Sequence, residues 1–575
     1  MKSLKITMFV LALLLAGGLA HAKKQPTPTP KPIGGLTFTD EYELTVVNVD
    51  VFVRDKKGRP VKGLTKNDFK IYQDGMEMPI TNFAVYTEEV FRHAIPGTPL
   101  PTATPAPDTV AAPKPEIKPI YIVLYVDNEN LRPLERNRVL RKIREWVKDT
   151  LHPPMQMMVV TYQKSLKIVQ RFTSDPREIN DALRSIRMQT GGRVERDSAR
   201  KDIIDLLNEY VEQERERPNA GAQNRQSYLN AYREIAAFAD EEANSMRFSL
   251  NAMREVITML AGLPGRKSML YISDGLPMIP GVDLMYEFMS VFHDQRILSM
   301  VSRYDFTKAF QSLGSYANGL GVTIYAVETR GLKVQGGFDA EHRHGQDVTS
   351  SSIGSHNYQD SLRYFADATG GLAIVNTNDV APGLELIRQD LQTYYSLGYT
   401  INASGADKVH RIKVECPTHP KYKLRYRRRF IEKSLESRVQ DRVMTGLVFE
   451  VKDNPMQVDV EVGTPAPATS ERWTVPLKVT FPLKKIALIP EGDDYVGRVI
   501  LFVAARDTDG KQSDIQRQEH EVRVPAANYD EAQLKRFAID LKLLMNTGTY
   551  TVSVGLMDQV TRAASYKAVK FVIQP

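Results

Sequence analysis

The stretch YIVLYVDNENLRPLERNRVL, residues 121–140, changes from an apolar run to a charged segment with helical character. A short apolar run without alternation is typical of a strand that is buried on both faces of a parallel sheet. The run ends at Asp127, and Glu129 follows two positions later. Sheets of α/β proteins bind their ligands beyond the carboxyl ends of the strands. The stretch therefore predicts an α/β sheet with carboxylates at the edge where ligands bind.

Strands and helices alternate from residue 118 onward, which indicates a parallel α/β sheet. Only Lys164 and Ser165 separate the second strand from the third, and a parallel crossover needs a dozen or more residues. We therefore expect a doubly wound sheet with one antiparallel edge strand. The strands are predicted at 120–127, 156–163, 166–172, 267–273, 321–328 and 372–376. The helices are predicted near 134–150, 176–188, 246–261, 307–319, 358–369 and 380–394.

The first residues have the three parts of a secretory signal peptide. Lys2 and Lys5 precede an apolar stretch, and Ala20-His21-Ala22 forms a cleavage signal. We expect residues 1–22 to be removed and the mature chain to be exported to the periplasm, the outer surface or the medium. The alternative is an uncleaved membrane anchor, but the apolar run is shorter than the ~20 residues that a span needs. No later segment of the sequence is apolar enough to span a membrane.

Two proline-rich tracts, residues 23–35 and 93–117, are predicted to be linkers. Between them, residues 36–92 contain valines that alternate with polar positions and an Asp-Gly turn after a short strand pattern. These features predict a small, separate β domain of sandwich-like type.

The α/β domain is predicted over residues 118–432. Its last part, 395–432, has short alternating runs that we expect to extend the sheet with antiparallel strands. A charged stretch at about 197–261 has apolar residues three and four positions apart, which predicts an inserted helical hairpin. The insertion is either a lid over the ligand-binding edge or a solvated arm. Residues 440–575 show strand patterns and turn signals, and predict a C-terminal β-sandwich-like domain.

Cysteine content and charge restrict the function further. The single cysteine, Cys416, excludes an intramolecular disulfide and is expected to be a buried, inert thiol, because no Cys-His-Asn arrangement surrounds it. The net charge is +7, but 76 basic residues are dispersed among 69 acidic ones. The one dense basic run, KYKLRYRRRF at 421–430, is typical of an edge strand with Lys and Arg on its solvent face. Because export leaves little opportunity for nucleic-acid binding, we predict no nucleic-acid partner.

Several stretches resemble a known fold. The segments IYIVLYVD, TGG, MLYISDGLP and GVTIYAVET are similar to those of the von Willebrand factor A (VWFA) fold. The segments VFVRDKKGRPVKGLTKNDFKIYQDG, YYSLGYT, HRIKVEC and LRYRRRF resemble the VWFA-related domain proteins described chiefly from Acidobacteria. The resemblance covers most of the chain up to about residue 430. It implies a VWFA-like, Rossmann-like sheet in an exported protein.

The resemblance also implies a metal-ion-dependent adhesion site (MIDAS), in which Asp-x-Ser-x-Ser, a loop Thr and a later Asp hold Mg²⁺ and leave one position for a partner's carboxylate. Asp127, Thr190 and Asp274 match the Asp, the Thr and the later Asp, but Glu129 and Leu131 replace the two serines. Leu131 cannot bind a cation, and Glu129 adds a charge. We therefore predict a degenerate site with no certain cofactor, and at most weak binding of Ca²⁺ or Mg²⁺. The alternative is that the two aspartates cap the following helices.

The sequence lacks a nucleophile elbow, an HExxH helix, a P-loop and a dinucleotide fingerprint. His342, His344 and His356 lack the spacing that a zinc site needs, and we interpret them as part of a polar loop. The sequence thus favours a non-enzymatic protein–protein interaction module of adhesion type, whose partner is another envelope or extracellular protein. Two alternatives remain: a metal-dependent hydrolase or other enzyme at the three carboxylates of this edge, and a structural envelope component.

Overall fold

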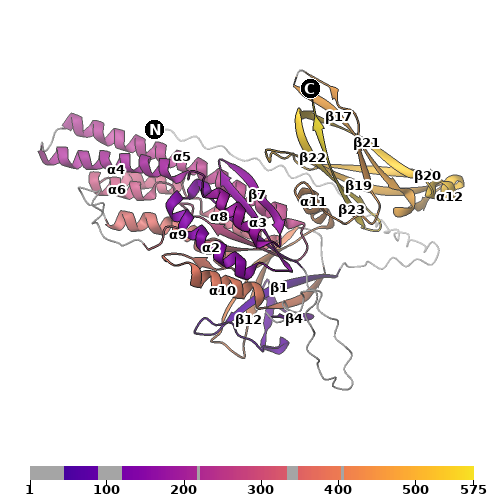
Figure 1. Ribbon diagram of the computed structural model, residues 1–575, viewed down its shortest axis with the longest axis horizontal. Coiled ribbons are helices and arrows are strands. Elements are labelled where there is room, and N and C mark those ends of the chain that lie inside the picture. The colour runs from indigo at the N-terminus through magenta and orange to yellow at the C-terminus, as the bar shows by residue number, and fades with distance from the viewer. Residues whose placement is uncertain are drawn as a thin grey trace, which may run out of the picture. The chain divides into compact units, whose positions relative to one another are not determined.

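The computed structural model describes residues 44–87, 119–216, 221–332, 348–402, 407–469 and 471–574 (Figure 1). The predicted signal peptide, both proline-rich tracts, His342 and His344 lie outside these residues. The described residues fall within one compact unit, Leu44–Pro575. These described residues form a mixed α/β structure with five sheets. No helix among the described residues has both the length and the apolar character needed to cross a membrane.

A six-stranded sheet forms the centre of the predicted α/β domain, with strand order β10-β9-β8-β5-β6-β7. Strand β7 pairs antiparallel with β6, and the other neighbours are parallel. This confirms the predicted mixed sheet with one antiparallel edge strand. The order also places the carboxyl ends of β5 and β8 side by side. The strands are β5 (Ile120–Val126), β6 (Met155–Gln163), β7 (Ser165–Thr173), β8 (Arg266–Ile272), β9 (Val322–Val327) and β10 (Ala373–Ile374).

Helices cover both faces of this sheet, because successive side chains of a strand point to opposite sides. On one face, Leu124 and Val126 of β5 share a buried cluster with residues of α2, α3 and α10. On the other face, Val123 and Tyr125 share a second cluster with residues of α5, α8 and α9. The sheet is therefore doubly wound, as the alternation predicted. The helices are α2 (Pro133–Thr150), α3 (Pro176–Ile186), α5 (Gly221–Ala261), α8 (Thr307–Gly319), α9 (Val348–Thr369) and α10 (Ala381–Gln392).

The predicted helical insertion consists of α4 (Arg193–Glu216) and the long α5. The last turns of α5 pack on the sheet through residues such as Met253 and Ile257. Its earlier turns share a separate apolar cluster with α4, and Figure 1 shows the two helices side by side. Three short helices that the sequence patterns did not predict complete this region: α6 (Val282–Phe292), η3 (Gln295–Leu298) and α7 (Ser299–Arg303).

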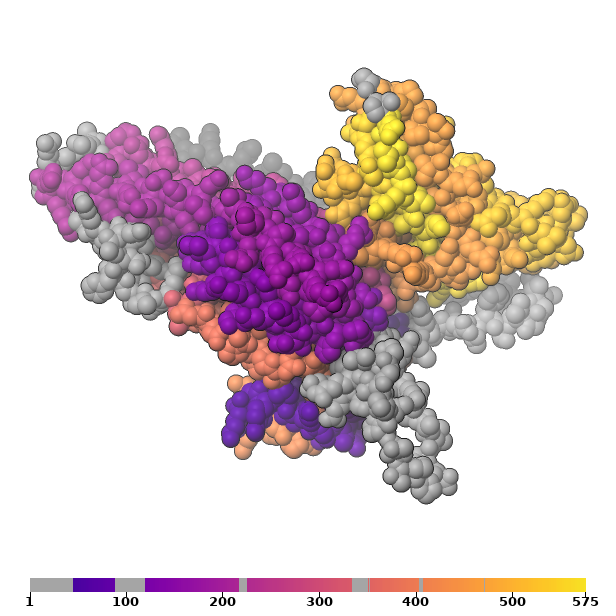
Figure 2. Space-filling model, in the orientation of Figure 1, coloured from indigo at the N-terminus to yellow at the C-terminus, as the bar shows by residue number. Residues whose placement is uncertain are grey.

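Strands from residues 44–86 and 394–432 pair with each other in two four-stranded sheets, here called the β unit. Val49 of β1 lies opposite Leu397 of β11, and both are buried in one core. Figure 2 shows the two segments, indigo and orange, side by side. The first sheet contains β13 (Lys423–Tyr426), β1 (Leu44–Arg54), β11 (Tyr394–Asn402) and β4 (Asn82–Tyr86). The second contains β14 (Arg429–Glu432), β12 (Lys408–Glu415), β2 (Lys70–Gln73) and β3 (Met76–Met78), and η1 (Lys66–Asp68) precedes β2.

The prediction that residues 395–432 extend the six-stranded sheet is wrong. Strand β11 pairs with β1 and β4, and β12 pairs with β2 and β14. The physical reason is that alternation shows which side of a strand is buried, but not which strand lies beside it. The predicted boundaries of segments 36–92 and 118–432 accordingly separate strands that share sheets.

After α11 (Leu435–Gly446), the remaining chain forms two antiparallel sheets around a shared apolar core. Met259 of α5, Val443 of α11 and Phe502 of β19 share one further apolar cluster. One sheet contains β15 (Asp459–Val462), β16 (Ala466–Pro467), β17 (Arg472–Pro482) and β21 (Arg536–Asn546). The other contains β18 (Ile489–Glu491), β19 (Asp494–Asp507), β20 (Gln516–Pro525), β22 (Gly548–Asp558) and β23 (Ala564–Ile573). The short helices here are η4 (Leu483–Lys485), η5 (Ala526–Asn528) and α12 (Tyr529–Gln533).

Candidate functional site

Asp127 follows β5 at the carboxyl edge of the six-stranded sheet and is only 1% exposed. Its carboxylate accepts hydrogen bonds from the hydroxyls of Tyr271 (2.7 Å) and Ser273 (2.8 Å). The side-chain amide of Asn130 also lies 2.9 Å from both carboxylate oxygens. Burial raises the pKa of Asp127, although these hydrogen bonds oppose the shift. The carboxylate thus already has protein donors on both of its oxygens.

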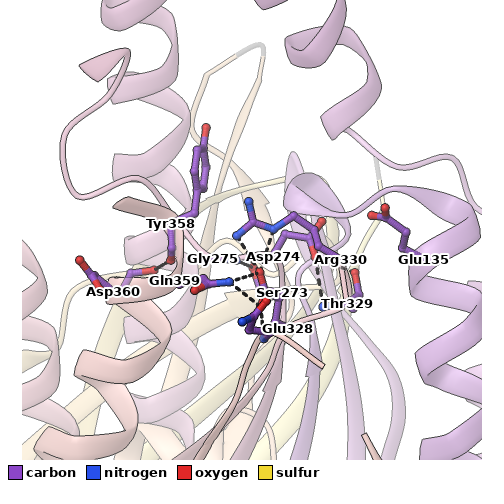
Figure 3. A network of polar contacts seen from close by, with 12 residues as sticks. Glu135, Ser273, Asp274, Gly275, Glu328, Thr329, Arg330, Tyr358, Gln359 and Asp360 are labelled. Carbon is purple, nitrogen blue, oxygen red and sulfur yellow. Dashed lines mark hydrogen bonds and ion pairs between the residues drawn. The ribbon is translucent and has the colours of Figure 1, made fainter. Parts of the chain in front are cut away.

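Asp274 follows β8 and is fully buried. Its Oδ1 accepts hydrogen bonds from the backbone N–H (3.1 Å) and the hydroxyl (2.6 Å) of Thr329, which lies in the loop after β9 (Figure 3). The next residue, Gly275, has φ +88°, and a Cβ there would lie 2.2 Å from the carbonyl oxygen of Tyr358. This explains the Asp-Gly pair, because only glycine permits both the backbone conformation and the close approach of α9.

The two aspartates do not act as the predicted helix caps. Asp127 precedes η2 (Asn128–Asn130) and makes no capping hydrogen bond from its side chain. Asp274 bonds to Thr329 instead of to a helix N-terminus. The capping alternative is therefore wrong for both residues, because their carboxylates point into polar networks that join neighbouring strands.

The TGG loop packs directly against the loop after β5. A Cβ on Gly191 would lie 2.1 Å from the carbonyl oxygen of Leu131, and a Cβ on Gly192 would lie 2.8 Å from that of Glu129. Leu131 is fully buried in the apolar core below the edge. The hydroxyl of Thr190 lies 3.5 Å from the side-chain amide of Gln163. The loop Thr is therefore close to the predicted site.

Asn128 and Arg136 form a hydrogen-bonded hub that connects the loop after β5 with the TGG loop, and the sequence patterns did not predict it. Asn128 is fully buried, and its amide donates to the carbonyl of Thr190 (2.7 Å) and to Gln163 Oε1 (2.7 Å). Its carbonyl oxygen accepts a hydrogen bond from Arg136 of α2, which also donates to the backbone carbonyl of Gln189 (2.9 Å). Burial lowers the pKa of Arg136 to about 10. Both of these acceptors of Arg136 are uncharged oxygens, so they do not neutralise its guanidinium. Arg136 therefore adds positive charge close to the edge.

Helix α4 carries Arg193, Arg196 and Arg200 at spacings that place them on one face. The Arg193 guanidinium carbon lies 4.4 Å from the ring centroid of Tyr358, and Arg196 donates to the carbonyl of Glu129. Arg200 forms an ion pair with Asp283 at 2.6 Å. We call these three residues the arginine row.

The arginine row lies beside buried carboxylates of the sheet edge. Burial lowers the pKa of Arg193, but Tyr358 and the carboxylates of Asp197, Asp274 and Glu242 raise it, and the net shift is upward. Burial raises the pKa of Glu242, whereas hydrogen bonding to Tyr358 and the charges of the row lower it in part. The positive charge of the arginine row thus acts on buried carboxylates of the sheet edge.

A second buried network borders the edge on the side of β9 (Figure 3). Glu328 and Arg330 form an ion pair at 2.8 Å, with side chains only 2% and 3% exposed. The carboxylate of Glu328 also accepts hydrogen bonds from the side chain of Gln359 (3.0 Å) and the backbone N–H of Asn376 (2.7 Å). No sequence pattern predicted this pair, since VETR resembles an ordinary strand end.

The oxygens of the edge do not fit the six-coordinate shell that Mg²⁺ prefers. The donors described above already occupy the Asp127 carboxylate, Leu131 has no ligand atom, and the Thr190 hydroxyl lies beside Gln163. Among the described residues, no three Asp, Glu, His or Cys side chains gather as a metal-binding group. The predicted set Asp127, Glu129, Thr190 and Asp274 therefore lies at one edge without forming an octahedral shell.

Three oxygens of this edge are nevertheless buried without a hydrogen-bond partner among the described residues: Glu129 Oε2, Asn130 Oδ1 and Asp274 Oδ2. Such atoms are unfavourable unless a charge or a solvent molecule compensates them. The guanidinium of Arg193 acts electrostatically on Asp274, and that of Arg196 on Asp127. Arg193 therefore compensates the charge of Asp274 in part.

Other residues singled out from the sequence lie elsewhere. His356 contacts the carbonyl of Ser352 one turn earlier in α9 (2.8 Å). Cys416 is 5% exposed in the core of the β unit. The basic run contributes β13, which is an edge strand as predicted. Its basic side chains do not all face solvent, because Arg425 forms an ion pair with the buried Asp390 at 2.5 Å.

No protein-family model matches this chain. No curated protein matches it either. Among solved structures, it is similar to an aerotolerance-related membrane protein from Bacteroides fragilis, with 11% identity and a TM-score of 0.21 over 48% of this chain and 98% of that one.

A conserved hypothetical protein, BatB, from Bacteroides thetaiotaomicron gives 11% identity and a TM-score of 0.21 over 48% of this chain and 97% of that one. A variant of the PilB minor pilin from Streptococcus sanguinis is also similar, with 10% identity and a TM-score of 0.24 over 60% of this chain and 87% of that one. Likenesses this low assign neither a fold family nor a function, so the proposal below rests on the residues of the edge.

Proposed function

We propose that this protein is an exported interaction module with a VWFA-like domain, which binds another envelope or extracellular protein without a resident metal ion. The observation that carries the proposal is the arginine row, because Arg193 and Arg196 lie beside the carboxylates that would otherwise hold a dication. The sequence resemblance and the doubly wound sheet with one antiparallel edge strand support the VWFA-like assignment.

The charges at the edge explain why a metal is not needed. Buried carboxylates are stable only if they are paired or hydrogen-bonded. Asp127 and Asp274 are held by hydroxyls and backbone groups, and the arginine row supplies the remaining positive charge. A metal-dependent adhesion site works differently, because its cation keeps one position open for a partner's carboxylate. Helix α4 contacts the loop after β5 through Arg196, so we expect partner binding to use a surface other than a cation at this edge.

One observation favours the alternative of a metal-dependent hydrolase or other enzyme at this edge. Glu129 Oε2 and Asp274 Oδ2 are buried without hydrogen-bond partners, and an ion would satisfy both. Arg193 opposes this alternative, since a dication beside a buried guanidinium would experience strong repulsion. A purely structural envelope component remains the third possibility, and it predicts no saturable partner.

Affinity capture from envelope fractions distinguishes these functions. The chain without residues 1–22 is immobilised, and capture is performed in millimolar Mg²⁺ and in EDTA. Each captured protein is then purified, and its Kd is measured in both buffers. The proposal predicts saturable binding whose Kd values agree within about twofold in the two buffers. Binding that disappears in EDTA would contradict the metal-free mechanism, and a complete lack of saturable binding would favour a structural role.

Export is tested separately, because residues 1–22 carry the only evidence for it. We expect N-terminal sequencing of the protein from its native host to begin at Lys23. A mature protein that still carries Met1 would contradict the proposed signal peptide.

A further inference from the structure

A cavity of about 450 Å³ lies at the opposite end of the six-stranded sheet from the arginine row. Its walls come from the amino ends of β8 and β9 and from strands β1, β4 and β11 of the β unit. Its volume is in the range that small-molecule sites usually have. The cavity therefore depends on the pairing of residues 44–86 with 394–402, which the sequence patterns did not predict.

The charged residues that line the cavity are unbalanced. Three cations, Arg266, Lys267 and Arg427, face one carboxylate, that of Asp50. Asp50 lies 3.8 Å from the Nε of Arg266, beyond hydrogen-bonding distance. Among the described residues, neither Lys267 nor Arg427 has a carboxylate partner within ion-pair distance, so the wall has an excess of positive charge.

The hydrogen bonds of these cations are also incomplete. Lys267 reaches only the backbone carbonyls of Ala261 (3.5 Å) and Leu263 (3.4 Å), which are long contacts. The guanidinium of Arg427 donates to the carbonyl of Asn48 (2.6 Å). The side chain of Arg266 is 7% exposed, and its two Nη atoms donate to the carbonyl of Asp390 (2.9 Å) and the hydroxyl of Tyr325 (3.2 Å), but its Nε has no hydrogen-bond partner among the described residues. A buried donor without an acceptor is rare in proteins and indicates a missing partner.

The energetics agree with this geometry. Burial, together with the charges of Arg427 and Lys433, lowers the pKa of Lys267 to about 8, and Asp441 partly opposes them. Burial likewise lowers the pKa of Arg427. Both shifts mean that the folded protein holds these charges at a cost, which a bound anion would reduce. Arg266 differs from these two residues: burial lowers its pKa, but Tyr325 and the carboxylates of Asp50 and Asp390 raise it, and the net shift is upward.

We propose that this cavity binds a small organic oxyanion of sugar size, with Lys267 and Arg427 holding its carboxylate or phosphate group. The side chains of Asn48 and Asn82, which also line the cavity, then contact the hydroxyl groups of the ligand. Neutral molecules of the same shape bind weakly, since they leave the cations uncompensated. This site is independent of the partner-binding function proposed above.

Calorimetric titration of the chain without residues 1–22 tests this inference with glucuronate, glucose 6-phosphate, inorganic phosphate and glucose as probes. We expect at least one anionic sugar to bind at least about tenfold more tightly than glucose. Preference for glucuronate or for glucose 6-phosphate distinguishes a carboxylate ligand from a phosphate ligand. Inorganic phosphate shows how much the anionic group contributes alone.

Variants locate the site. Lys267→Met should weaken the tightest anionic probe by at least about tenfold, whereas Lys267→Arg keeps the charge and should restore most of the affinity. Lys423→Met is the matched control, because Lys423 is exposed and does not line the cavity. Circular dichroism confirms that each variant is folded. The proposal is overturned if no anionic probe binds the folded protein up to millimolar concentration, or if Lys267→Met binds as tightly as the control.

Discussion

The two ends of the six-stranded sheet differ in how their buried charged groups are paired. At the carboxyl end, the carboxylate of Asp127 accepts bonds from neighbouring hydroxyls and an amide, and the arginine row supplies positive charge. At the amino end, Lys267 and Arg427 line a cavity in which no carboxylate of the described residues lies within ion-pair distance of either. The comparison indicates that a sequence motif alone is a poor guide to a binding site. The carboxylates that the motif singles out have protein partners, whereas Lys267 and Arg427 lie where no motif points.

The largest expected effect is that of Asp127→Ala. Removal of this carboxylate leaves the hydroxyls of Tyr271 and Ser273 buried without acceptors, so we expect a loss of about 3 kcal/mol in the free energy of unfolding. Urea denaturation measures it. Asp127→Asn keeps the size and one acceptor oxygen and should cost clearly less. If Asp127→Ala is as stable as the natural chain, the carboxylate is not structural and the carboxyl end remains available for a ligand.

The next effect concerns the buried pair beside the edge. Arg330→Met leaves the Glu328 carboxylate with only Gln359 and the backbone N–H of Asn376, and we expect a loss of about 2 kcal/mol. The double variant with Glu328→Gln should recover part of this loss, since it removes the unpaired charge. Equal stability of the single and double variants in the same denaturation series would show that the pair is not coupled.

The third effect concerns Lys267 at the amino end of the sheet, where we expect no large loss of stability. Lys267→Met removes a half-buried charge that makes only long contacts with carbonyls, so stability should stay within about 1 kcal/mol of the natural chain or rise. Denaturation without added anions measures it. A loss as large as that of Asp127→Ala would mean that Lys267 is a structural residue.

The last effect is a pH dependence at the amino end. Burial, together with Arg427 and Lys433, holds the pKa of Lys267 at about 8, below its ordinary value of 10.5, while Asp441 opposes them. Above pH 8 the folded chain therefore binds fewer protons than the unfolded chain at this residue, and its contribution to stability rises with pH up to about 10.5. The difference in stability between the natural chain and Lys267→Met, measured from pH 7 to 10.5, should show this rise. A flat difference would contradict the shifted pKa.

Much of the central sheet could be predicted, because buried strands and amphipathic helices leave strong periodic signals in a single chain. The run at 120–126 and the close spacing of β6 and β7 were sufficient for the parallel strand and the antiparallel edge. The pairing of β1 with β11 could not be predicted, since alternating residues show which side of a strand is buried but not which strand pairs with it. The amino-end cavity was missed for the same reason.

At the carboxyl edge, the sequence predicted which residues lie there but not which groups their side chains contact. Asp127, Glu129, Thr190 and Asp274 do come from loops at this edge. The sequence could not show that Tyr271 and Ser273 satisfy Asp127, because these bonds join different strands. The spacing of Arg193, Arg196 and Arg200 was visible, but only the placement of α4 shows that their charges act on the edge.

Calorimetric titration with Mg²⁺ and Ca²⁺ tests the metal-free edge most directly. It compares the chain without residues 1–22 with the double variant Arg193→Gln and Arg196→Gln, after circular dichroism has confirmed folding. We predict at most millimolar affinity for either ion in the natural chain, and tighter Ca²⁺ binding in the double variant, whose carboxylates lose their guanidinium neighbours. Micromolar Mg²⁺ binding by the natural chain, abolished by Asp127→Asn, would contradict the proposal and show an intact adhesion site.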